Sequence, residues 1–322
     1  MTSASILSLI FLSLSGENIH INLYPSLEIG GGYDSNILFE SAGKTEGFFN
    51  QTSSSFGLDL KLTEKLGFFT DYEILYTNYS AGSFSSLDNF LAAGLTVRPF
   101  GTLSLKLLGQ WEAFDPNDRP EYRFTRLVAF PSIEGSWGSL ILRTAFYYSL
   151  IEFQDRPVVA PFHPTENQTD TEMETFVFIG YTFGKRSAAS ITYSYIETRS
   201  NLIEDERHTL DSYGNSVTLN IWQALWRKAR LNLRFQTLFR EFEDNPINPI
   251  DINSTMREDE LYKASLIFRQ GLTEYLEGFV SLSYLQLNSN NSAEEFTRTF
   301  IFVGFSVLFD PVRMDRQWRE VR

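Results

Sequence analysis

Hydrophobic and polar residues alternate with a period of two along most of the chain. FGLDLKL (56–62), LSLKLLGQW (103–111), ASITYSY (189–195) and RLNLRFQ (230–236) all show the pattern. Successive side chains of a strand point to opposite faces, so this period predicts strands with one apolar and one polar face. A convincing helical period is absent, and the residues after Phe309 are the only weak candidate for a helix. The sequence therefore predicts an all-β protein.

The pattern divides into about 14 strands, most of them 12–16 residues long. The predicted spans are 19–34, 52–63, 67–79, 87–99, 102–114, 121–134, 138–153, 171–184, 187–199, 212–226, 229–242, 258–270, 275–288 and 296–309. Strands of soluble proteins usually have about 5–6 residues. A strand that crosses a bilayer at a tilt needs about 9–11 residues and continues beyond the lipid. The lengths therefore favour membrane-spanning strands.

The connections between these strands alternate strictly between long and short. The long ones are 35–51, 80–86, 115–120, 154–170, 200–211, 243–257 and 289–295, and the short ones are EKLG, PFGT, EGSWG, GKRS, WRKA and GLTEY. This arrangement predicts an antiparallel up-and-down transmembrane β-barrel, with long extracellular loops opposite short periplasmic turns and both chain ends.

Aromatic residues make up 15% of the chain and gather near the predicted strand ends. Those near the short turns are Phe100, Trp137, Phe183, Trp226, Tyr275 and Phe309; those near the long loops are Tyr79, Trp111, Tyr122, Phe153, Tyr195, Tyr213, Phe239, Tyr262 and Tyr284. Two aromatic belts are typical of membrane interfaces. Aromatic residues favour any strand, but the belts, strand lengths and loop alternation together favour the membrane barrel.

The net charge, the cysteine content and the N-terminal sequence narrow the possible classes of protein further. The net charge of −13 argues against nucleic-acid binding, and the absence of cysteine excludes zinc–cysteine sites and thiol catalysis. Residues 1–15 contain a short apolar block followed by the small-x-small sequence Ser13-Leu14-Ser15. This pattern predicts a secretory signal peptide, although no basic residue precedes the block. The alternative is a first buried strand.

Over nearly its whole length the chain resembles Gram-negative outer-membrane β-barrel proteins. RTFIFVGFSVLF (298–309) resembles the aromatic-ended last strand that the barrel-assembly machinery recognises, although DPVRMDRQWREVR follows it here. The resemblance implies a barrel over 19–309 in the outer membrane, in contact with lipid and lipopolysaccharide, and a basic periplasmic tail at 310–322. The oligomeric state stays open.

The polar face of each strand should line the lumen. Fourteen strands at about 4.8 Å spacing and about 40° tilt give a backbone diameter near 28 Å. The inward charges segregate into an acidic wall of Glu28, Asp59, Asp71 and Glu73 and a basic wall of Arg230, Arg234, Arg240, Lys263 and Arg269. Opposed charged walls favour a selective channel. The alternatives are charges that pair across a plugged lumen, and a non-conducting barrel for adhesion, anchoring or envelope structure.

The stretch SLEIGGGYDSNILF (26–39) contains the most unusual motif, Gly30, Gly31 and Gly32. A dinucleotide-binding fingerprint would need glycine where Ser35 stands, so we predict a bend at the barrel seam between the first and last strands. GGGYDSNIL resembles a segment of outer-membrane barrels associated with exopolysaccharide secretion, which implies polymer export with a periplasmic partner. With three histidines and no nucleophile motif, we predict no enzyme, no metal site and no cofactor.

Overall fold

The computed structural model describes residues 20–37, 45–80, 84–117, 119–157, 167–201, 203–204, 208–209, 211–226, 228–246 and 255–309. The predicted signal peptide (1–15) and basic tail (310–322) lie outside these residues and remain predictions. No helix among the described residues is long and apolar enough to cross a membrane.

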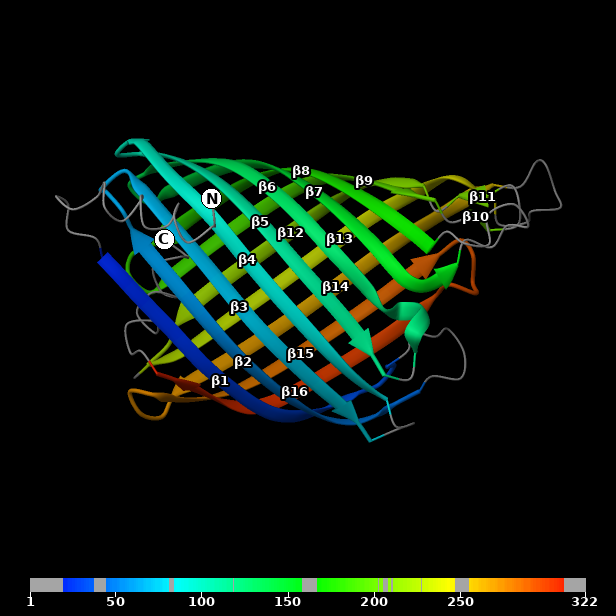
Figure 1. Cartoon of the computed structure of the whole chain (residues 1–322), viewed down its shortest axis with the longest axis horizontal. Helices are drawn as coiled ribbons and strands as arrows, with labels where there is room; N and C mark the ends of the chain where they lie inside the picture. Colours follow the sequence, from blue (N-terminus) through cyan, green and yellow to red (C-terminus); the bar gives the residue numbers. More distant parts are fainter. Residues whose placement is uncertain are drawn as a thin grey trace, which may run out of the picture.

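Fourteen long strands of the described chain form one closed barrel (Figure 1). They are β1 (His20–Asp34), β2 (Gly47–Lys61), β3 (Leu66–Tyr79), β4 (Ser85–Phe100), β5 (Leu103–Pro116), β6 (Phe124–Trp137), β7 (Leu140–Pro157), β8 (Asn167–Phe183), β9 (Ser187–Ser200), β12 (Ser212–Ala224), β13 (Ala229–Pro246), β14 (Met256–Gly271), β15 (Leu276–Ser289) and β16 (Phe296–Leu308). A two-stranded sheet, β10 (Ile203–Glu204) and β11 (His208–Thr209), and a 3-10 turn, η1 (Pro120–Tyr122), lie at the long-loop end.

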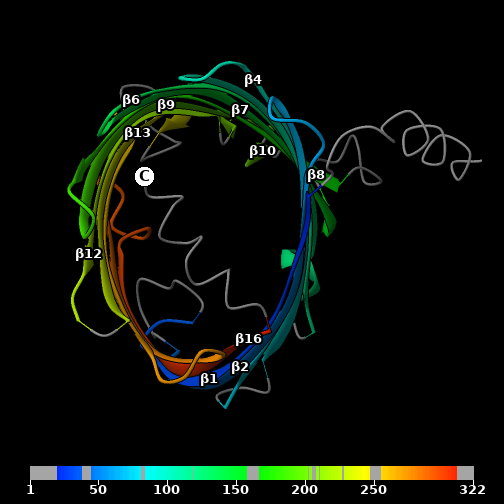
Figure 2. The same cartoon turned by 90° about the vertical axis from the view of Figure 1, so that its left-hand side faces the viewer.

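Each barrel strand pairs with its neighbours in antiparallel fashion, and β1 closes the ring by pairing with β16. Figure 2 shows the resulting oval ring of strands from the short-turn end. Because the strand number is even, β1 begins and β16 ends at that same end, where the Phe309 amide donates to the Pro25 carbonyl at 3.2 Å. The predicted antiparallel barrel of 14 strands is confirmed.

The structure differs from the prediction at the long-loop end. β2 begins at Gly47 rather than near residue 52, because residues 47–51 pair with residues 30–34 of β1. The β10–β11 hairpin was not predicted either. Strand segments that rise above the lipid need no apolar face, so they lack the alternation from which strands are predicted.

The barrel exterior is covered by exposed apolar side chains. Phe56, Leu107, Ile133 and Phe305 point outward and are each about half exposed, at 46%, 55%, 50% and 56%. Soluble monomers rarely expose a continuous apolar surface of this kind, and lipid covers it without cost.

The aromatic residues near the short turns form an exposed outer belt. Phe100, for example, is 70% exposed and Trp226 62% exposed. Two residues of the predicted belt near the long loops face inward instead: Tyr79 packs on Phe49 and Phe153 on Phe124. Their position in the strand alternation, counted from the register, places them on the lumen side.

The short turn before β13 carries a backbone conformation that favours glycine. Lys228 has φ 68°, whereas the comparable left-handed positions in two other turns are Gly138 (φ 61°) and Gly184 (φ 70°). A side chain costs about 1 kcal/mol in this region. We therefore expect Lys228→Gly to raise the free energy of unfolding in lipid vesicles by about 1 kcal/mol.

Gly138→Ala is the matched test in the opposite direction, because an added Cβ there meets no atom within 4 Å. Only backbone strain remains, so this variant should lose about 1 kcal/mol. A stability loss in Lys228→Gly measured by urea titration would contradict the account.

Candidate functional site: the barrel lumen

The strand register defines which side chains face the lumen. On β2 the inward positions include Ser53, Ser55 and Asp59, and the exposed apolar residue Phe56 lies on the opposite face. Residues paired across neighbouring strands point to the same face, so the inward positions can be followed from strand to strand around the closed ring. The register places all four residues of the acidic wall and all five of the basic wall on the inner face.

The acidic wall lies on β1, β2 and β3. Glu73 accepts a hydrogen bond from the Ser53 hydroxyl on the neighbouring strand. Asp71 lies opposite Gly57 and is exposed although it points into the barrel. Glu28 reaches toward the basic wall, with its carboxylate 3.7 Å from Arg269. The acids therefore line the inner surface, where Asp71 is exposed and Glu28, Asp59 and Glu73 are half-buried.

Two members of the basic wall are held in ion pairs at the short-turn end. Arg230 and Arg269 both bind the carboxylate of Glu277, and the Arg269 contact measures 3.0 Å. The side chains of Arg230 and Glu277 are only 8% and 2% exposed. A buried carboxylate between two guanidinium groups satisfies the charge that burial would otherwise penalise. These arginines hold β13, β14 and β15 together.

A third member, Arg240, faces Asp259 across β13 and β14 near the long-loop end. Asp259 also accepts hydrogen bonds from Arg257, at 3.0 and 2.8 Å. Arg240 thus lies in a mixed cluster whose charges partly cancel.

Arg234 and Lys263 differ from the rest of the basic wall. Both are exposed inside the lumen, and neither forms an ion pair with any described residue. They interact electrostatically with each other, and Lys263 also with Arg298. Their positive charge is therefore presented to the water in the lumen.

The acidic and basic walls lie on different sides of the ring: they meet where Glu28 contacts Arg269 and are farthest apart at β3 and β13. In the closed order, β3 and β13 are separated by β2, β1, β16, β15 and β14 on one side and by the other seven barrel strands on the other. In the end view, β1 and β2 (blue) and β12 and β13 (yellow-green) occupy different walls of the oval (Figure 2). Exposed charges of opposite sign on facing walls produce a field across the lumen.

The three predicted seam glycines lie where β1 meets β16. Gly30 is paired with Gly304, Gly31 with Val303 and Gly32 with Phe302. Gly30 and Gly32 face the lumen, and a Cβ on Gly30 would lie 2.5 Å from Val303 O. Glycine therefore allows the closing strands to approach each other here.

An aromatic cluster covers the seam glycines from the inside. Phe49, Phe279 and Phe302 are buried at 3%, 3% and 5% exposure, with Phe300 and Tyr79 packed against them. The ring centroids of Phe49 and Phe300 are 4.8 Å apart and stacked. The cluster fills the space that the missing glycine side chains leave on the inner face.

An ion pair fastens the long-loop end of the same seam. Asp34 is completely buried and accepts a bidentate hydrogen bond from Arg298, with 2.9 Å between Asp34 Oδ1 and Arg298 Nε. Asn36 adds a bond from its side-chain amide to the Thr297 carbonyl at 3.2 Å. The polar part of GGGYDSNIL thus joins β1 to β16.

Comparisons with known proteins identify the fold. No family model matches the chain, and no curated protein matches it. The outer membrane channel DcaP of Acinetobacter baumannii is similar in structure (TM-score 0.55, 10% identity, 91% of this chain and 98% of that chain). So are an anion-selective porin from Comamonas acidovorans (0.51, 10%, 91% and 100%) and a bacterial polysaccharide outer membrane secretin (0.50, 7%, 89% and 98%). The chain has the fold of outer-membrane β-barrels. Its apolar exterior agrees with the predicted place in a Gram-negative outer membrane.

Sequence reasoning missed several charged groups in the lumen of this barrel. Glu277 pairs with two of the five residues of the basic wall, while Asp88 on β4 and Glu112 on β5 extend the acidic surface beyond β3. The alternation of β15 could have revealed Glu277, since it shares the parity of Ser281 and Ser283. Its pairing with Arg230 and Arg269 depends on the register of the strands, which the sequence alone does not show.

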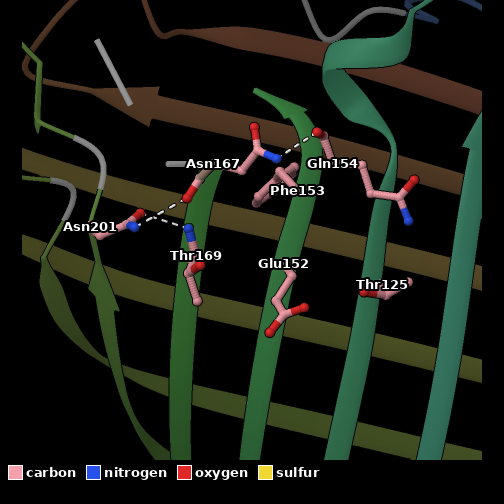
Figure 3. Close-up of a pocket in the computed structure, with 7 residues that line it drawn as sticks. All are labelled: Thr125, Glu152, Phe153, Gln154, Asn167, Thr169 and Asn201. Atoms are coloured by element: carbon pink, nitrogen blue, oxygen red, sulfur yellow. Dashed lines mark hydrogen bonds between the residues drawn. The ribbon is translucent and has the colours of Figure 1, made fainter. Parts of the chain in front are cut away.

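A pocket of about 480 Å³ opens at the long-loop end of β6–β9 (Figure 3). The side-chain amides of Asn167 and Asn201 are already engaged: Asn167 donates to the backbone carbonyl of Gln154 at 2.6 Å, and Asn201 accepts from the Thr169 backbone amide at 2.6 Å. The bonds lie where the register of β7 and β8 shifts. We assign these groups to strand pairing at the rim.

Proposed function

We propose that this outer-membrane barrel is a channel that passes small polar solutes. The observation that carries the proposal is the exposure of Asp71, Arg234 and Lys263, which point into the barrel and are nevertheless accessible to solvent. Side chains in a filled barrel interior would be buried against one another. The proposal assigns no catalytic reaction to the barrel.

Solute passage can be measured by swelling of liposomes that contain the refolded full chain. We expect swelling in arabinose that slows as the solute grows to a tetrasaccharide, because a side-chain-lined lumen sieves by size. Absence of swelling from protein with a heat-dependent gel shift would instead support the alternative of a non-conducting barrel.

Polymer export is the second candidate. It is supported by the likeness of GGGYDSNIL to exopolysaccharide-associated barrels and by the fold shared with the polysaccharide secretin. Export would need a periplasmic partner. We propose also that lipopolysaccharide surrounds the long-loop end and that the barrel-assembly machinery recognises β16. Deleting the gene should reduce surface polysaccharide if the barrel exports it, and should leave it unchanged if the barrel is a general channel.

A further inference from the structure

The two unpaired cations lie in a defined patch of the inner wall. The register of β12, β13 and β14 places two successive inward rows side by side. The first row is Asn220, Arg234 and Ser265, and the second is Thr218, Gln236 and Lys263; we term these six residues the basic patch.

The positive charge of the basic patch is not compensated within the described protein. Arg234 and Lys263 are diagonal neighbours on adjacent strands. The Cα atoms of such neighbours are about 7–8 Å apart. Like charges at this spacing repel each other. The basic patch therefore favours an anion over a neutral ligand, and the planar guanidinium of Arg234 suits a carboxylate.

On the β9 and β12 side, the surroundings of these cations are polar but uncharged. The inward positions on β9 and β12 include Ser190, Thr192, Ser194, Thr198, Ser216, Thr218 and Asn220. Hydroxyl and amide groups both donate and accept hydrogen bonds, as the hydroxyl groups of a sugar do. This composition distinguishes the wall from a simple cluster of lysines and arginines.

The acidic wall limits where an anion can travel. Asp59, Asp71 and Glu73 lie on β2 and β3, nearly opposite β13, and repel negative charge. An anionic solute is thereby confined to the side that carries the basic patch.

We propose that the basic patch is a binding site for anionic saccharides, sugars that carry a carboxylate, on their way through the lumen. The proposal deepens the channel function and rests on it. The cations recognise the carboxylate, and the flanking hydroxyl and amide groups recognise the sugar ring.

Binding can be followed separately from passage. Trp222 points inward on β12, two residues from Asn220, so its fluorescence should respond to a ligand at the basic patch. We expect trigalacturonate to bind the refolded full chain at least about tenfold more tightly than maltotriose, because charge-assisted hydrogen bonds are the stronger ones.

Arg234→Gln and Lys263→Gln should each weaken trigalacturonate binding about tenfold and leave maltotriose unchanged. Lys61→Gln is the matched control, because Lys61 is also an exposed inward cation but lies on β2 at the short-turn end. It should bind like the unaltered protein. Equal binding of the two trisaccharides, or equal loss in Lys61→Gln, would overturn the proposal.

Single-channel recordings test the channel function and the saccharide-binding site separately. If the protein conducts but trigalacturonate blocks it no better than maltotriose, the saccharide proposal fails and the channel stands. If the fluorescence preference is present but no conductance is seen, the channel fails and the binding site stands.

Discussion

Gly32→Ala is expected to prevent much of the chain from closing into a barrel. A Cβ at this position would overlap the carbonyl oxygen of Ile301 and lie 2.6 Å from the Phe49 ring. Ile301 belongs to β16, so the clash is with the backbone of the closing strand and cannot be relieved by a side-chain rotation. Overpacking of this kind costs about 3 kcal/mol.

The measurement is the fraction of refolded protein with a heat-dependent gel shift, together with urea unfolding in vesicles. Gly109→Ala is the matched control: it is also a strand glycine, but its Cβ would have no neighbour closer than 3.9 Å. We expect that change to stay within about 0.5 kcal/mol. If the two variants refolded to the same extent and were equally stable, this would refute the close approach of β1 and β16 at the seam.

Asp34→Asn should destabilise the barrel by about 3–5 kcal/mol, because it removes the negative charge that compensates the guanidinium of Arg298 in a largely buried pair. Asp34 is fully buried and the Arg298 side chain is 19% exposed, so water cannot readily replace the lost carboxylate. Unfolding should therefore begin by separation of β1 from β16 at the long-loop end. Hydrogen exchange at Tyr33 and Ile301 would detect this locally.

A solvent-exposed ion pair provides the control. Asp115 and Arg123 are 2.8 Å apart, with side chains 48% and 36% exposed, so Asp115→Asn should cost less than about 1 kcal/mol. Replacing both seam partners, in Asp34→Leu with Arg298→Met, should recover much of the stability. Equal losses in Asp34→Asn and Asp115→Asn would show that the seam pair contributes little.

The fold was predictable because each strand has one face in lipid. The outward residues Leu105 and Leu107 of β5 alternate with Ser104 and Lys106, and such patterns gave the strands to within a few residues. Prediction failed where the lipid constraint ends. Residues 47–51 of β2 lie above it, and Tyr79 looked like an outer-belt residue although it faces the lumen.

The lumen site was predictable in outline only. Alternation alone places Arg230 and Arg234 on the same inner face of β13, so the sequence presents them as equivalent. The structure separates them, because Glu277 of β15 lies within reach of Arg230 and not of Arg234. Which inner charges stay available thus depends on the register of strands that are far apart in sequence.

Conductance of the refolded full chain in a planar lipid bilayer tests the channel most directly. The account predicts discrete, reproducible current steps that increase with salt concentration, since the lumen between the acidic and basic walls is filled with water. Protein that shows the heat-dependent gel shift of a folded barrel, yet gives no steps above the bare bilayer, would contradict it.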